Sequence, residues 1–75
     1  MNQLYVFLIS GVSFYATGSL NAEDINKVEN LLHSFMSKFP EEPEETLFNS
    51  FIREILTKYK IRLKPVKINH VFRFI

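Results

Sequence analysis

The sequence LYVFLISGVSFYATGSL, residues 4–20, predicts a β-hairpin. Its first part, Leu4–Ser10, is rich in β-branched and aromatic residues and is apolar on both alternating faces, which is typical of a central strand. Ser10 and Gly11 form a turn signal, and after it residues 12–20 alternate between apolar and polar, as in a half-buried strand. The apolar face of this second strand carries Val12, Phe14, Ala16 and Leu20.

Two amphipathic helices are expected after the hairpin. Asn21 is suited to the N-cap of the first helix, which should run from about residue 22 to residue 38, and Asp24 adds a carboxylate to its first turn. The second helix should run from about residue 44 to residue 59, with Pro43 at its first position. Its apolar residues cover close to half of the helix circumference, so we expect more than one neighbour. They are Leu47, Phe48, Phe51, Ile52, Ile55, Leu56 and Tyr59.

The C-terminal segment predicts a last strand with an irregularity. Ile61 and Leu63 share one face, but after Pro65 the apolar residues fall one position out of phase. A β-bulge at residues 64–65 explains the slip, since proline cannot donate to the ladder and is tolerated at bulges. We therefore predict one long bulged strand, and a turn at residues 69–70 that makes a last hairpin is the alternative. The apolar positions after the slip are Val66, Ile68, His70, Phe72 and Phe74.

These elements, in the order ββααβ, predict an α+β fold with two helices on one face of a small antiparallel sheet. The 75 residues, 1–75, have room for a single domain, and the absence of cysteine means that packing alone must hold it together. A domain of this size buries only about 60% of the surface of its unfolded chain. Because 47% of the residues are hydrophobic, we expect apolar surface to remain exposed and to need a partner.

The near-neutral net charge of +1 hides a polarised chain. Residues 1–52 carry two cations and seven carboxylates, whereas residues 53–75 carry seven cations and one carboxylate. This asymmetry predicts one acidic and one basic surface, which would steer association with charged partners.

The apolar residues 4–16 also resemble the hydrophobic region of a signal peptide. We reject that interpretation because no lysine or arginine precedes Lys27 and because Ser10, Gly11 and Ser13 interrupt the run. No apolar run approaches the roughly 18 residues that a membrane-spanning helix needs. We therefore expect a soluble cytoplasmic protein that does not associate with a membrane.

Motifs of catalysis and cofactor binding are missing from the sequence. It has no cysteine nucleophile, no glycine-rich phosphate loop and no His-Glu-x-x-His pair. Glu29 and His33 are spaced to share a helix face, but two groups cannot complete a metal site or an acid–base constellation, so we interpret them as an exposed pair. His70 is interpreted as a core or rim residue. We expect no enzyme activity, no cofactor, no metal site and no catalytic residues.

A cluster of carboxylates precedes and opens the second predicted helix. It allows two interpretations: favourable charges at a helix N-terminus next to a solvated loop, or a patch that competes for a basic, normally nucleic-acid-binding surface of another protein. The first interpretation is favoured, because such runs are common. The cluster consists of Glu41, Glu42, Glu44 and Glu45.

Cations on the last predicted strand form a candidate nucleic-acid contact. Single-strand-binding proteins stack bases on aromatic rings and neutralise phosphates with nearby cations. Here the rings would be Tyr15 and either Tyr5 or Phe7. The alternative, which is favoured, is that the cations protect an edge strand from aggregation. The cations are Arg62, Lys67 and Arg73.

Surplus apolar surface is the strongest functional signal. The first strand has Leu4, Val6 and Leu8 on one face and Tyr5, Phe7 and Ile9 on the other, but helices of the same chain can cover only one face. A homodimer or a host protein docked on the second face, or on the wide stripe of the second helix, would provide the missing cover. The candidate contact residues are Tyr5, Phe7, Ile9, Phe48, Ile52 and Leu56.

We identify no family from the sequence. The ββα start followed by an acidic linker is similar in general form to small proteins of viruses and mobile elements. We therefore expect a non-catalytic protein-interaction module, an inhibitor of the anti-defence or anti-CRISPR kind that blocks a larger host complex by occupying its surface. The alternatives are a single-stranded nucleic-acid-binding sheet and a structural homodimer.

Overall fold

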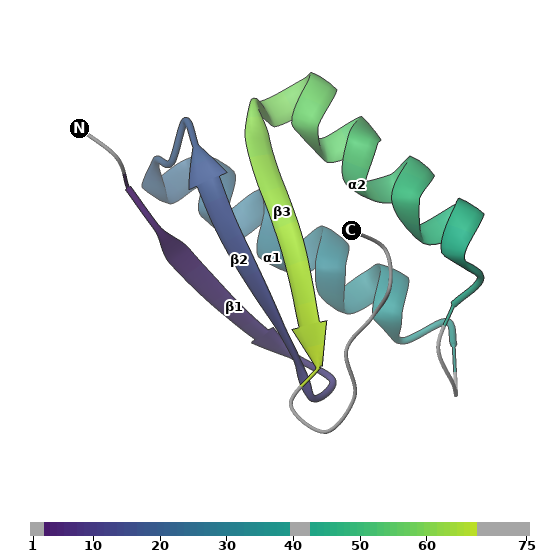
Figure 1. Cartoon of the computed structure of the whole chain (residues 1–75). Coiled ribbons are helices and arrows are strands. Elements are labelled where there is room, and N and C mark those ends of the chain that lie inside the picture. The colour runs from purple at the N-terminus through teal and green to yellow at the C-terminus, as the bar shows by residue number, and fades with distance from the viewer. Residues whose placement is uncertain (1–2, 40–42, 68–75) are drawn as a thin grey trace.

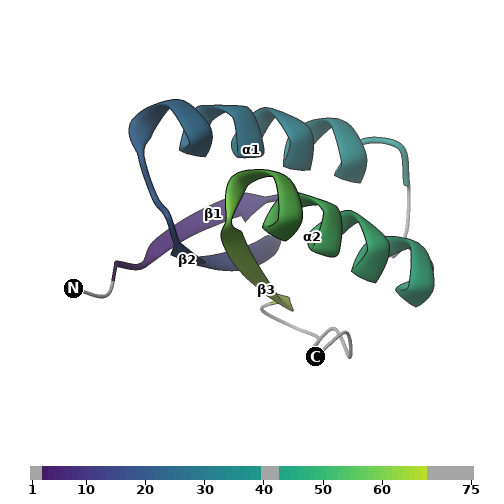
Figure 2. The same ribbon diagram turned by 90° about the horizontal axis from the view of Figure 1, so that it is seen from above.

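The computed structural model describes residues 3–39 and 43–67 and shows an α+β fold in the predicted order ββααβ. A three-stranded antiparallel sheet forms one layer, and two helices pack on one of its faces (Figure 1, Figure 2). The elements are β1 (Tyr5–Ile9), β2 (Val12–Gly18), α1 (Ala22–Met36), α2 (Glu45–Tyr59) and β3 (Ile61–Lys67).

The strand order in the sheet is β1-β2-β3, so β2 is the central strand and β1 lies at an edge (Figure 1). The prediction that the first strand is central was therefore wrong. A strand that is apolar on both faces is typical of burial on both faces, but here only one face of β1 is buried. Its other face is an exposed apolar row.

The hairpin between β1 and β2 has the predicted two-residue turn. Ser10 and Gly11 both adopt positive φ, 54° and 77°, which is the backbone geometry that twists in the same sense as the flanking strands. The register follows directly, with Ile9 opposite Val12 and Phe7 opposite Phe14.

The two helices differ in how they begin. At α1 the Asn21 Oδ1 accepts a hydrogen bond from the Asp24 N–H (2.9 Å), and the Asn21 Nδ2 donates one to the Asp24 carboxylate (3.0 Å), so the predicted cap is confirmed. At α2 the N-cap is Glu44, whose side chain makes no capping hydrogen bond. Pro43 is buried just before this cap, so the prediction that it opens the helix was wrong.

No bulge interrupts β3 over its described length, which corrects the prediction at residues 64–65. The pairing with β2 runs unbroken from Ile61 to Lys67, with Pro65 opposite Phe14. Because the Phe14 backbone groups face β1, the alternation of the ladder leaves the Pro65 nitrogen on the free side of β3, where no hydrogen bond is lost. Pro65 is buried and continues the inner face itself. Residues 68–75, including the predicted turn at 69–70 and His70, lie outside the described residues.

Aromatic rings join the three parts of the core. The ring centroid of Phe48 in α2 lies 6.0 Å from that of Phe14 in β2 and 5.8 Å from that of Phe35 in α1, and Phe35 stacks on Phe51 at 4.1 Å. The sheet and both helices therefore share one core. Its buried residues are Phe7, Ile9, Val12, Phe14, Ala16, Val28, Leu32, Phe35, Met36, Phe48, Ile55, Ile61 and Leu63.

Candidate interaction surface

The face of the sheet opposite the helices, here called the outer face, is uncovered in the described part of the chain. Leu4 and Leu8 are 63% and 74% exposed there, and Val6 and Tyr15 are 38% and 39% exposed. Large apolar side chains with this exposure contribute an unpartnered surface. The outer face consists of Leu4, Val6, Leu8, Ser13, Tyr15, Thr17, Arg62, Lys64 and Val66.

Chemical character changes across the outer face from strand to strand. One row of the register runs from Val6 through Tyr15 to Lys64. The β1 side is apolar, β2 contributes hydroxyl groups, and β3 adds the exposed cations Arg62 and Lys64. Such a surface suits a partner with an apolar patch bordered by carboxylates.

Three of the predicted apolar contact residues belong to the core instead. Phe7 and Ile9 are 2% and 1% exposed, and Phe48 is fully buried, so none of them is accessible to a partner in this fold. The sequence prediction chose the wrong face of the first strand. The correct face could have been predicted from the hairpin register. A two-residue turn places Phe7 opposite Phe14, on the strongly apolar face of β2.

The other three predicted contact residues are partly exposed but lie apart from the outer face. The Tyr5 ring packs at 4.8 Å from the Phe7 ring, at the end of the inner face. Ile52 and Leu56 line a shallow groove of about 290 Å³ between α2 and β3. The structure therefore does not bring the six predicted residues together as one surface.

The predicted basic ribbon is only partly assembled. Arg62 is exposed and pairs with Thr17, two residues along β2 from Tyr15. Lys64, which was not among the predicted contact residues, is the register partner of Tyr15. Lys67 is the register partner of Val12. Because no bulge interrupts β3, position 67 shares a face with position 65 and not with Arg62. Arg73 lies outside the described residues.

Tyr15 is the one aromatic residue among the described positions of the outer face. Tyr5 and Phe7, the other rings predicted to lie near the cations, belong to the inner face. A single ring offers little stacking surface to the successive bases of a nucleic-acid strand, so binding of single-stranded nucleic acid stays a prediction.

The acidic cluster is described only in part. Glu44 and Glu45 are exposed at the start of α2, where their charge favours the helix N-terminus, while Glu41 and Glu42 lie outside the described residues. The competing interpretation, a patch that imitates nucleic acid, stays a prediction.

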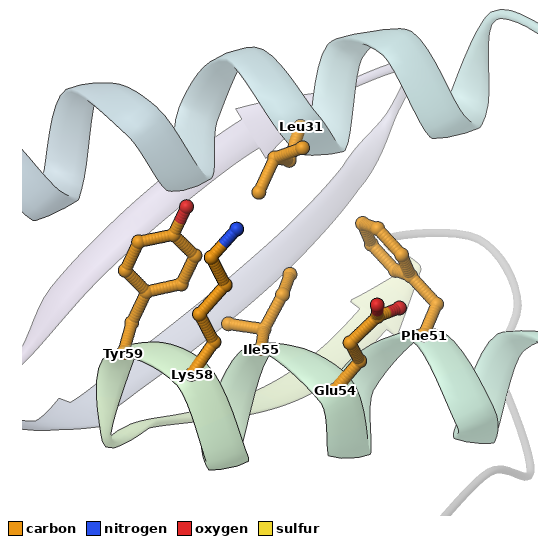
Figure 3. A pocket seen from close by; sticks show the side chains of 6 residues that line it. All are labelled: Leu31, Phe51, Glu54, Ile55, Lys58 and Tyr59. Atoms are coloured by element: carbon orange, nitrogen blue, oxygen red, sulfur yellow. The ribbon is translucent and has the colours of Figure 1, made fainter.

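Figure 3 shows a small hollow between the two helices, into which Lys58 and Tyr59 of α2 extend toward Leu31 of α1. The Lys58 ammonium lies 5.5 Å from the centroid of the Tyr59 ring, within range of a cation–π interaction. The volume is about 90 Å³, well below the roughly 300–1,000 Å³ of small-molecule sites.

The described residues contain no group of three histidine, cysteine, aspartate or glutamate side chains that could hold a metal ion. Glu29 is half-buried and His33 is exposed, both on α1. Within residues 3–39 and 43–67, neither helix combines the length and apolar character that crossing a bilayer requires.

Comparison with protein-family models, with curated proteins and with solved structures gave no match. The outer face is thus the feature from which a function can be inferred.

Proposed function

We propose that this protein is a non-catalytic protein-interaction module that binds a larger protein through the outer face of its sheet. The observation that carries the proposal is the apolar row of Leu4, Val6 and Leu8, which is exposed although a core is available on the other side of the same strand. Exposing large aliphatic side chains in a row costs solvation free energy, about 25 cal/mol per Å². A partner that covers the row recovers this free energy.

The mode of action that fits this surface is occupation. A small sheet that covers a functional face of a larger host complex inhibits it without chemistry of its own. Arg62 and Lys64, at the far side of the outer face, would orient the contact by pairing with carboxylates of that complex. This mode is the inhibitor function expected from the sequence.

The experiment compares two leucine-to-aspartate variants in affinity capture from native cells, with and without nuclease. Leu8 is exposed on the outer face and Leu47 is 46% exposed on α2, so Leu8→Asp and Leu47→Asp add the same charge to different layers. We expect Leu8→Asp to lower recovery of a specific protein at least about tenfold, because desolvating a carboxylate opposes binding. Leu47→Asp should leave recovery unchanged.

Equal recovery by the two variants would contradict the proposal, as would turnover of a substrate by the purified protein. Loss of the captured protein on nuclease treatment would favour the nucleic-acid alternative instead.

A further inference from the structure

The two edges of the sheet differ sharply in chemistry. β3 carries Arg62, Lys64, Pro65 and Lys67, whereas β1, Tyr5–Ile9, contains neither a charged residue nor a proline. Charges and proline are the usual protection of an edge strand against pairing with another strand. One edge of this sheet is therefore protected and the other is not.

Some backbone N–H and C=O groups of β1 point away from the sheet, where another strand could pair with them. Ile9 and Val12 flank the two-residue turn, so their backbone groups face each other in the ladder. Because these groups alternate along a strand, the N–H and C=O groups of Val6 and Leu8 point away from β2. In the described part of the chain no strand lies on that side of β1 (Figure 1).

Neither helix blocks this edge near its start. An open hollow of about 400 Å³ lies there, at the margin between β1 and α1. A neighbouring strand can thus approach the start of β1 without displacing a helix. The hollow is lined by Gln3, Leu4, Tyr5, Leu20 and Ile25.

We propose that β1 pairs in antiparallel fashion with β1 of a second copy of this chain, so that two sheets join into one continuous six-stranded sheet. With the two-fold axis at Val6, Leu4 of each copy lies opposite Leu8 of the other. The three exposed aliphatic residues of each copy then form a single apolar band at the middle of the joined outer face.

The charge distribution favours a second copy that pairs through β1 and disfavours one that pairs through β3. The β1 strands have no like charges to bring together, and the cations of β3 end up at the two far edges. Five inter-strand spacings of about 4.8 Å separate those edges by roughly 24 Å, several times the Debye length of about 8 Å. Pairing through β3 would instead place arginine and lysine side chains roughly 5 Å apart, which is unfavourable.

This inference goes beyond the proposed function, because it concerns the edge of β1 and not the outer face. Each can fail without the other.

The test is sedimentation velocity of the purified chain across a dilution series from high micromolar to nanomolar concentration. Val6→Pro removes the outward N–H without breaking a bond to β2, and Val6→Ala keeps the N–H as the matched control. We expect a wild-type dimer and a dimer at most about fivefold weaker for Val6→Ala, which loses one cross-strand side-chain pair but keeps both hydrogen bonds at the axis. Val6→Pro should dimerise roughly 30-fold more weakly than the wild type, since these two hydrogen bonds each contribute about fivefold.

A monomer at all concentrations, or a Val6→Pro variant that dimerises like Val6→Ala, overturns the inference. Should Val6→Pro fail to fold, hydrogen exchange of the wild-type chain decides: the Val6 and Leu8 amides must be protected at high concentration and exchange quickly on dilution. Fast exchange at every concentration also overturns it. Partner capture by the wild-type chain at concentrations where sedimentation shows only monomer leaves the proposed function intact.

Discussion

Gly18 and Lys60 meet where β2 ends and where α2 gives way to β3. Gly18 has φ of +112°, and a Cβ built on it would collide with the Lys60 carbonyl. That same carbonyl accepts a hydrogen bond from the Ser19 N–H (3.1 Å). Lys60 itself adopts the left-handed conformation, φ 60°, that ends α2. The junction therefore depends on one residue without a side chain.

Replacing this glycine is expected to destabilise the fold strongly. Gly18→Ala combines backbone strain with a backbone collision, and we expect the free energy of unfolding to fall by about 3 kcal/mol. Gly11→Ala is the matched control, because Gly11 also has positive φ but a Cβ there meets nothing within 4 Å. That variant should lose only about 1–2 kcal/mol, the cost of left-handed backbone alone.

Urea denaturation of both variants measures the difference between them. Equal losses would mean that the close approach to Lys60 contributes nothing beyond strain.

At the scale of elements, Phe35 connects the two helices. Its ring stacks on Phe51 of α2 at 4.1 Å and lies 5.0 Å from the ring of Phe39, which follows the end of α1, so one α1 side chain contacts aromatic rings of α2 and of the segment after α1. Packing of α1 against α2 thus depends on one buried residue more than on the exposed ones around it.

Truncating this ring should separate the helices. We expect Phe35→Ala to lower the free energy of unfolding by about 3–5 kcal/mol, the usual range for a buried phenylalanine. Leu31→Ala, at a 37% exposed position of the same helix, should cost less than about 1.5 kcal/mol. Thermal denaturation followed by circular dichroism compares the two variants, and similar melting temperatures would show that the stack is not the main helix contact.

Local patterns predicted the elements well, and failed where pairing between distant segments matters. The apolar spacing of residues 22–36 and the Asn21 cap identify α1 because each signal lies within a few residues of its effect. Pro65 was misread because its place depends on which edge of β3 is free, and β3 pairs with a strand far away in sequence. Over residues 61–67 the proline marks the free edge of β3 and not a bulge.

The candidate site was predictable in kind but not in position. Composition correctly indicated that apolar side chains stay exposed, since Leu4 and Leu8 are. Which face of β1 they occupy depends on the register with β2. Val12 and Phe14 mark the apolar face of β2, and the register places Ile9 and Phe7 opposite them, which leaves Leu4 and Leu8 on the other face. The groove between α2 and β3 arises only from tertiary packing, so no local sequence pattern predicts it.

For the whole molecule, the consequence of the unprotected edge is a link between stability and concentration. The proposed dimerisation through β1 would stabilise the native state by mass action, because the unfolded chain has no strand to pair. We expect the melting temperature of the wild-type chain to rise with protein concentration, and that of Val6→Pro to begin to rise only at concentrations roughly 30-fold higher. Calorimetry at several concentrations tests this, and a wild-type melting temperature independent of concentration would contradict it.

The central place of β2 also sets an order of events for folding. The β1–β2 hairpin closes over a two-residue turn, so its contacts are local and form early, whereas β3 must return from the far end of the described chain. Until β3 arrives, β2 has one ladder edge empty, and the nascent sheet is open on both sides. We expect chain synthesis to pass through this doubly open hairpin, so residues 61–67 are the segment that covers the free edge of β2 and shortens the time for which that edge is exposed to misassembly.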